Sequence, residues 1–242
     1  RAALRLQAYS TREDGFLTLC APCRSSICIP SFSLYWTIAV YENALRDYDD
    51  EFVKEMLPYA EKLLSTFQSN TDERGVCCFK ETPYWNFYEW SEGYDNLMDN
   101  SIRIANPDFN DGIYKVLVCL GIKSVIYLAK RKGDLDSIRK YTDMYESLKK
   151  EINETFWDEE KGAFIDSYAS GRRKVTRHAN IFAILFGIVD EKQTESIVAN
   201  VIKNDKITKI TTPYFEGYEL DVLAKLGYAV KDSKTGYELI KN

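Results

Sequence analysis

The stretch from Pro83 to Gly93 combines the residue types that bind a sugar. It holds five aromatic residues and two carboxylates in eleven positions, and neither a helical nor a strand period runs through it. The apolar face of a sugar ring packs on flat aromatic side chains, while its hydroxyl groups hydrogen-bond to acidic groups. Trp85, Glu89 and Trp90 are therefore candidate substrate-binding residues. The alternative is an ordinary aromatic plug between helices.

Two further residues could take part in chemistry, and each has a plain structural alternative. His178 is the only histidine, and it lies near Arg172, Arg173 and Arg177, a cluster that a polysaccharide lyase would need beside a uronate. Such a charge run is usually a solvated loop, and His178 could equally be a helix N-terminal residue with a satisfied ring. Glu216 could be a first-turn residue that the helix dipole favours.

The cysteines favour reduced thiols over a metal site. Cys20 and Cys23 have the spacing of a redox or zinc pair, but no plausible second pair accompanies them. A chain of this length also builds a sufficient core without a disulfide framework. We expect no metal, no cofactor and a cytoplasmic location. The other cysteines are Cys28, Cys77, Cys78 and Cys119.

Composition excludes several classes of partner. The chain has 242 residues, 45% of them hydrophobic and 29% charged, with a formal net charge of −5, which is ordinary for one globular domain spanning 1–242. The acidic balance argues against nucleic acid, and no apolar run reaches about 18 residues, so we expect no membrane span. The pattern starts and stops inside apparent helices, so we expect a fragment of a longer protein.

The apolar pattern predicts alternating buried and amphipathic helices. Ser31 is expected to cap a helix with apolar positions at Phe32, Tyr35 and Trp36. Helices that are apolar almost all round are expected at about 109–132, 179–186 and 213–226. Amphipathic helices are expected at about 52–67, 134–154 and near 197–202, and a small hairpin at 156–173.

This order indicates an all-α fold, an (α/α)6 toroid of helical hairpins that is incomplete, with about four hairpins. If the buried helices run parallel, the loops before them converge at one rim, together with the aromatic stretch, His178 and Glu216. We predict that Trp90 lines a concave pocket there, beside the turn at 211–214. An ordinary multi-helix globule would give a similar pattern.

Five blocks of the chain resemble the catalytic six-hairpin domain of bacterial α-L-rhamnosidases. The blocks occur in the order Arg12–Gly15, Ile29–Trp36, Trp85–Ser91, Arg177–Asn180 and Thr212–Leu220. The resemblance implies an (α/α)6 barrel and an inverting hydrolase that releases terminal L-rhamnose from a carbohydrate substrate.

The same resemblance implies that the catalytic carboxylates lie outside the chain. The family's general acid falls before the position of Arg1 and its general base after that of Asn242, and neither motif is present. Within the chain the remaining candidates are Glu89, Glu92 and Glu216. The family has a Gly-Asp pair before the tryptophan that matches Trp90, where this chain has Tyr88-Glu89. The candidate substrate-binding set is Trp90, Glu89, Trp85, Phe32, Trp36, His178 and Tyr214.

Three functions follow as hypotheses. The first is a catalytic fragment of a glycoside hydrolase, the second a non-catalytic carbohydrate-binding helical piece, and the third a polysaccharide lyase on the same toroid. An incomplete ring would leave apolar helix faces open, so self-association through those edges is also expected.

Overall fold

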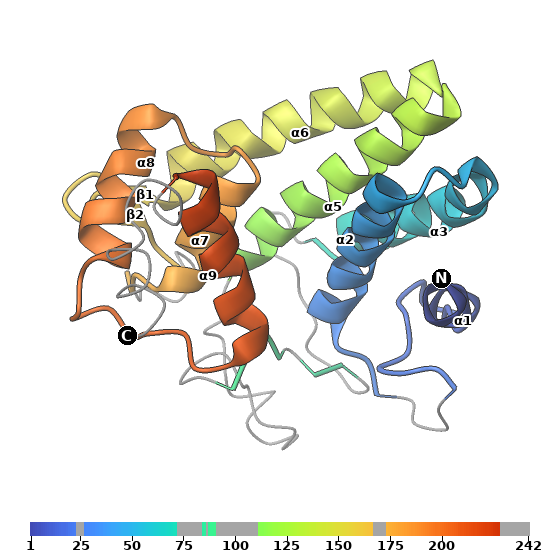
Figure 1. Cartoon of the computed structure of the whole chain (residues 1–242), viewed down its shortest axis with the longest axis horizontal. Helices are drawn as coiled ribbons and strands as arrows, with labels where there is room; N and C mark the ends of the chain where they lie inside the picture. The colour runs from blue at the N-terminus through green and yellow to red at the C-terminus, as the bar shows by residue number, and fades with distance from the viewer. Residues whose placement is uncertain (23–26, 72–83, 86, 91–110, 167–172, 228–242) are drawn as a thin grey trace.

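The computed structural model describes residues 1–22, 27–71, 84–85, 87–90, 111–166 and 173–227 (Figure 1). The helices are α1 (Ala2–Tyr9), α2 (Pro30–Arg46), α3 (Asp50–Ser69), α5 (Asp111–Lys132), α6 (Leu135–Phe156), α7 (Arg177–Leu185), α8 (Glu191–Ile197) and α9 (Pro213–Lys225). A short π-helix, η1 (Val198–Ile202), continues α8, and the strands β1 (Trp157–Asp158) and β2 (Ala163–Phe164) form an antiparallel hairpin. The all-α prediction and the predicted hairpin are both confirmed.

Helix α5 is the centre of the core. It contacts α2, α3, α6 and α7, which explains why apolar side chains surround it. A Cβ at Gly121 would lie 3.1 Å from Cδ2 of Leu64 and 3.2 Å from Cδ2 of Leu34. Glycine therefore lets α5 pack closely against α2 and α3.

The same helix is the part of the described chain that resembles a membrane span. Gly112–Lys132 is long and apolar enough to cross a bilayer, with a mean hydropathy of 1.7 in its most apolar window. In the fold, 83% of that window is buried inside the protein. A buried core helix passes the same test, so the match is weak evidence for a membrane segment.

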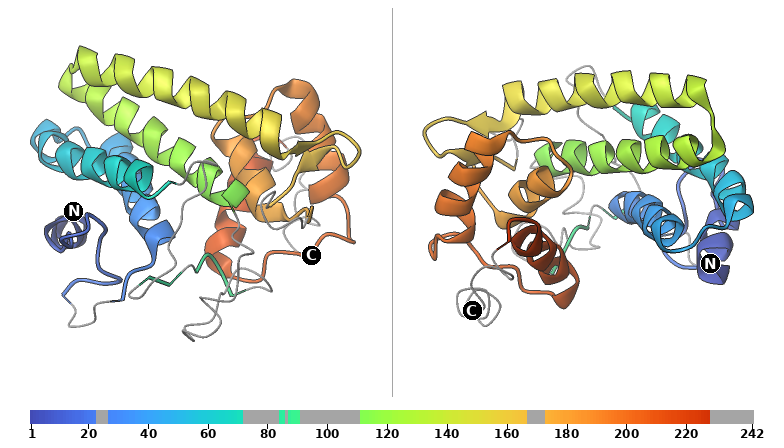
Figure 2. Two further views of the ribbon diagram at one scale, coloured as in Figure 1. Left: turned by 180° about the vertical axis from the view of Figure 1, so that it is seen from behind. Right: turned by 45° about the horizontal axis from the view of Figure 1, so that its top comes forward.

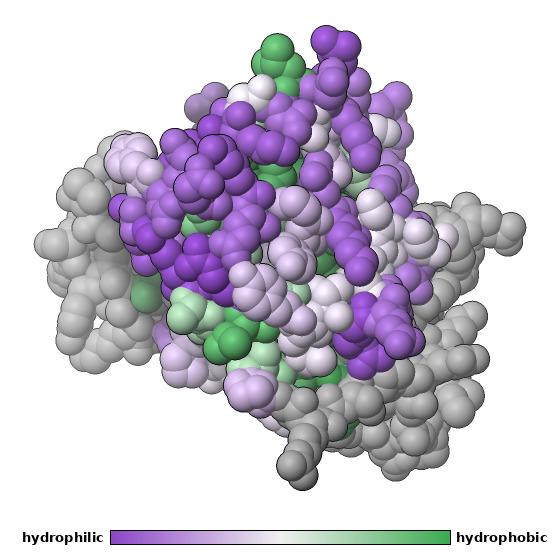
Figure 3. Space-filling view, turned by 90° about the vertical axis from the view of Figure 1, so that its right-hand side faces the viewer, coloured by the Kyte–Doolittle hydropathy of each residue, from purple (hydrophilic) through white to green (hydrophobic). Residues whose placement is uncertain are grey.

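Helices α3 and α6 cover the core from outside (Figure 2). Each buries one stripe of apolar side chains and begins at an aspartate: Asp49 accepts a hydrogen bond from the Phe52 N–H at 3.1 Å, and Asp134 accepts one from the Ser137 N–H at 3.1 Å. These N-caps satisfy backbone donors of the first turn. The face of the molecule at the N-terminal end is largely hydrophilic in Figure 3, as expected for outer helices.

The C-terminal helices differ in burial. In α7, every residue from Arg177 to Ile184 is buried, as predicted. In α9 only Phe215, Val222 and Leu223 are buried, so the prediction of a third fully buried helix is wrong. The reason is that α9 packs mainly against α7, which leaves its other side exposed.

The N-terminal ends of α2 and α9 lie on either side of the aromatic stretch, of which residues 84–85 and 87–90 are described (Figure 1). Ser31 does not cap α2, because the helix already begins at Pro30 with Ile29 as its N-cap. Instead, the buried Ser31 hydroxyl donates a hydrogen bond to the Phe87 carbonyl at 2.6 Å. The Trp85 N–H donates to the Cys28 carbonyl at 2.7 Å. These bonds fix the stretch against the start of α2.

Candidate functional site

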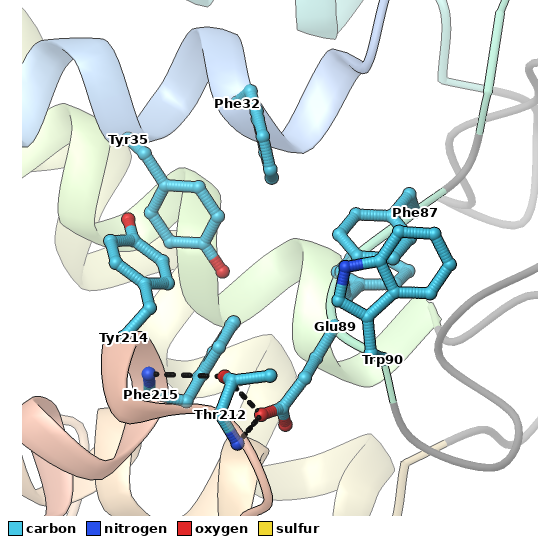
Figure 4. A pocket seen from close by; sticks show the side chains of 9 residues that line it. Phe32, Tyr35, Phe87, Glu89, Trp90, Thr212, Tyr214 and Phe215 are labelled. Atoms are coloured by element: carbon cyan, nitrogen blue, oxygen red, sulfur yellow. Dashed lines mark hydrogen bonds between the residues drawn. The ribbon is translucent and has the colours of Figure 1, made fainter.

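A cavity of about 450 Å³ opens where these three segments meet (Figure 4). Its volume lies within the range of about 300–1,000 Å³ typical of small-molecule sites. Helix α2, the aromatic stretch and the start of α9 each contribute to its wall. The lining residues are Phe32, Tyr35, Phe87, Tyr88, Glu89, Trp90, Thr212, Tyr214 and Phe215.

Trp90 gives the cavity its most exposed aromatic face. Its side chain is 62% exposed, and it packs edge-on against Phe87 with ring centroids 4.8 Å apart. Trp85 lies behind this pair, 4.8 Å from Phe87 and 5.8 Å from Trp90. Tyr214 and Phe32 are also exposed and line the cavity. Such a wall leaves flat aromatic faces open to a ligand.

Glu89 is the carboxylate of the cavity and is only 1% exposed. One oxygen accepts hydrogen bonds from the Thr212 N–H, at 2.9 Å, and from the Thr212 hydroxyl. The other oxygen hydrogen-bonds to Nε2 of the buried His178. Burial raises the pKa of Glu89, but the bonds from His178 and Thr212 outweigh it and hold the pKa below its ordinary value. Glu89 is therefore ionised at neutral pH.

The turn before α9 is joined to the aromatic stretch. The Thr211 hydroxyl donates to the Trp90 carbonyl at 3.0 Å. The Thr212 hydroxyl also accepts the Phe215 N–H at 3.5 Å as the N-cap of α9. Trp90 lines a concave pocket beside the turn at 211–214, so that prediction is confirmed.

The predicted site residues divide into two groups. Phe32, Glu89, Trp90 and Tyr214 line the cavity. His178 lies behind the wall, where it bonds to Glu89 and packs against Phe215 with ring centroids 4.9 Å apart. The others lie elsewhere: Trp85 is buried behind the wall, Trp36 is in the core with its Nε1–H bonded to the Leu4 carbonyl at 3.0 Å, and Glu216 is exposed on α9. Glu92 lies outside the described residues. Neither Trp36 nor Glu216 is in a position to contact a ligand in this cavity.

Five lining residues are absent from the predicted site set, namely Tyr35, Phe87, Tyr88, Thr212 and Phe215. Tyr35 matches the apolar helical period of α2, which does not distinguish a cavity position from a core position. Thr212 was recognised only as part of the turn that opens α9. The position of Thr212 directly before Pro213, at the start of a helix, could have indicated the N-cap. Nothing in the sequence indicated that Thr212 bonds to Glu89.

The cationic cluster expected around His178 does not converge on the cavity. Arg173 pairs with Asp158 at 2.8 Å, and the buried Arg177 pairs with Glu219 and donates to the Ile202 carbonyl at 3.0 Å. Arg172 lies outside the described residues. In the described part of the cavity wall there is thus no cation that could hold a uronate carboxylate.

Two of the described cysteines, Cys28 and Cys119, are buried, and the third, Cys20, is exposed. Burial raises the pKa of Cys28 and of Cys119 to about 12, which keeps both thiols protonated. Among the described residues no three His, Cys, Asp or Glu side chains gather as a metal site would need. Cys23, Cys77 and Cys78 fall outside them, so the absence of metal stays a prediction.

Comparison of the whole chain with family models decides its family. The model described as Trehalase matches residues 91–217, more than half of the chain. The chain belongs to the trehalase family. Among curated proteins, none matches this trehalase-family chain.

Solved structures share its fold. The GH78 family rhamnosidase of Bacillus sp. GL1 matches 93% of this chain with a TM-score of 0.74 and 21% identity, and a rhamnosidase from Klebsiella oxytoca matches 98% with a TM-score of 0.77 and 20% identity. The trehalase-family chain spans 22% and 43% of those two chains, respectively. The predicted (α/α)6 glycosidase fold, similar to that of α-L-rhamnosidases, is confirmed.

Proposed function

We propose that this chain is part of the catalytic domain of a glycoside hydrolase, and that its aromatic cavity holds one neutral sugar ring of the substrate. The observation that carries the proposal is the cavity itself, with Trp90 and Tyr214 as open aromatic faces and ionised Glu89 at its edge. Family membership supports the hydrolase class.

The charge of the cavity supports a neutral ring over a uronate. Among the described residues of the cavity wall, Glu89 carries a carboxylate, and none is a lysine or an arginine. A uronate carboxylate would face this negative charge without a cation to compensate it, which is unfavourable in a partly desolvated site. The polysaccharide lyase is therefore the less supported hypothesis.

For the reaction, we propose the inverting hydrolysis of an α-L-rhamnoside, on the basis of the sequence blocks and the solved rhamnosidases with this fold. An inverting enzyme uses a protonated carboxyl as acid and a carboxylate as base, about 6.5–9.5 Å apart. Glu89 does not suit the acid, because its lowered pKa keeps it ionised. Its hydrogen bonds to His178 and Thr212 also make it a poor base. We assign Glu89 to the sugar-binding wall and place the acid and base outside the described residues.

Titration of the intrinsic tryptophan fluorescence tests the proposal. The probes are L-rhamnose, methyl α-L-rhamnoside, α,α-trehalose and D-glucuronate. We expect saturable binding of at least one neutral sugar and none of D-glucuronate, because Trp90 is exposed at the cavity.

A Trp157→Phe variant serves as the control. Trp157 lies in β1, outside the cavity wall, so its replacement should leave the sugar-induced change intact. Absence of saturable binding by every neutral sugar would contradict the proposal. Binding of D-glucuronate alone would favour the lyase.

A further inference from the structure

The phenolic hydroxyl of Tyr35 has no hydrogen-bond partner among the described residues. The side chain is only 7% exposed, yet it lines the cavity and its hydroxyl points toward the space between Phe32, Phe215 and Trp90 (Figure 4). Buried hydroxyl groups are nearly always paired, so an exception in a cavity wall requires an explanation.

Three other polar side chains of the wall are already engaged with the protein. Glu89 is bonded to His178 and Thr212, and the Thr212 hydroxyl also caps α9. The Tyr214 hydroxyl lies 3.2 Å from the Tyr218 hydroxyl. Tyr35 differs from these three, because its buried hydroxyl has no partner among the described residues and remains available to a ligand.

Neighbouring rings hold the Tyr35 ring in place. Its centroid lies 5.9 Å from that of Phe32, at an interplanar angle of 65°, and 5.6 Å from that of Tyr214, at 88°. The Tyr218 ring stacks on it with centroids 6.4 Å apart. Phe182 and Phe215 pack at 6.4 and 5.9 Å. The hydroxyl cannot turn away to water, so its direction is fixed before a ligand arrives.

We propose that Tyr35 is a specificity-determining residue that hydrogen-bonds one hydroxyl group of the sugar ring in the aromatic cavity. This inference rests on the proposed function. A phenol both donates and accepts, and burial holds the pKa of Tyr35 well above its ordinary value, so the proton stays available. A sugar without the matching hydroxyl leaves the phenol buried and unpaired, and sites of this kind discriminate strongly against such analogues.

The test combines Tyr35→Phe with monodeoxy sugars. Binding to the wild-type chain and to Y35F is measured by tryptophan fluorescence for L-rhamnose and its 2-, 3- and 4-deoxy analogues, and for α,α-trehalose and its 2-, 3- and 4-deoxy analogues. For the wild type, we expect one deoxy position to weaken binding about tenfold, in line with the typical effect of one hydrogen bond. In Y35F the parent sugar should bind about tenfold more weakly, and removal of that one hydroxyl should have no further effect.

Thermal unfolding without sugar separates this role from a structural one. Tyr35→Phe removes a hydroxyl that has no protein partner, so the Tm should stay the same or rise. Tyr145→Phe is the matched control, because the Tyr145 hydroxyl donates to the Phe186 carbonyl at 2.8 Å and the Gly187 carbonyl at 3.1 Å, and its Tm should fall.

Equal affinity of Y35F and the wild type for the parent sugar would overturn the inference and leave the proposed function standing. A fall in Tm for Y35F as large as that for Y145F would overturn it as well. If no sugar of either series binds the wild-type chain, the proposed function fails, and the role of Tyr35 fails with it.

Discussion

Glu89 and His178 lie 89 residues apart in the chain and meet in a buried hydrogen bond. Glu89 comes from the aromatic stretch and His178 from the first turn of α7. Because the carboxylate also binds the residue that caps α9, one side chain connects the aromatic wall of the cavity to two helix N-termini. The cavity therefore depends on Glu89 for its shape as well as for its charge.

Replacement of Glu89 should destabilise the protein. Glu89→Ala removes the acceptor for His178 and Thr212 and should lower the free energy of unfolding by about 1.5–3 kcal/mol, the typical contribution of hydrogen bonds to a charged group. Urea denaturation measures the change. Glu216→Ala is the control, since Glu216 is exposed, and it should change stability by less than about 0.5 kcal/mol. Equal effects of the two substitutions would contradict the assigned role of Glu89.

The contribution of Glu89 should depend on pH in the acid range. Its folded pKa is lower than the ordinary value of 4.5, so its stabilising effect is complete above that pH and is lost as the pH falls through the lowered pKa. The difference in free energy of unfolding between wild type and Glu89→Gln should therefore shrink below pH 4.5. His178, the titratable group in contact with Glu89, is kept in both proteins. A difference that is constant from pH 3 to 7 would mean that the carboxylate is not selectively stabilised in the fold.

Truncation of Trp90 should weaken sugar binding with little effect on stability. Burial of one large apolar side chain contributes about 1.5–3 kcal/mol, so Trp90→Ala should raise the Kd for a bound neutral sugar by about tenfold or more. Trp90→Phe keeps an aromatic face and should lose less. Isothermal titration calorimetry measures both variants, because each lacks Trp90, the tryptophan at the cavity. Unchanged affinity in Trp90→Ala would remove Trp90 from the binding wall.

The chain of 242 residues should not turn over an aryl α-L-rhamnoside at a useful rate. Each positioned acid or base contributes about 10²–10⁴-fold, and the described cavity wall offers only Glu89, which is ionised and hydrogen-bonded. Release of the aryl alcohol is the measurement, with the Klebsiella oxytoca rhamnosidase assayed alongside as positive control. Efficient turnover that Glu92→Gln abolishes would show that a catalytic carboxylate lies in this chain after all.

The sequence predicts the helices better than the residues of the cavity wall. Buried and amphipathic helices differ in the spacing of their apolar residues, which can be read directly from the local sequence. The burial of α5 and α7 follows from that spacing. The exposure of α9 does not follow from its apolar pattern, because that pattern does not specify how many other helices pack against it.

Tyr35 and Trp36 show the same limit at single-residue scale. Adjacent helical residues point about 100° apart, and both match the apolar stripe of α2. Only tertiary packing decides that Tyr35 faces the cavity while Trp36 turns toward α1 and bonds to the Leu4 carbonyl. The Glu89–His178 bond is similarly invisible to local pattern, since it joins segments far apart in the chain.

The hydrogen bond between Glu89 and Thr212 also affects when the cavity can form. The two residues are 123 positions apart, and contacts with long sequence separation form late because the intervening chain must first be ordered. On the ribosome, α2 and the aromatic stretch emerge well before the residues that close the cavity around them. Until residue 212 has been synthesised, the carboxylate of Glu89 lacks that partner, and the nascent chain has no complete sugar-binding wall.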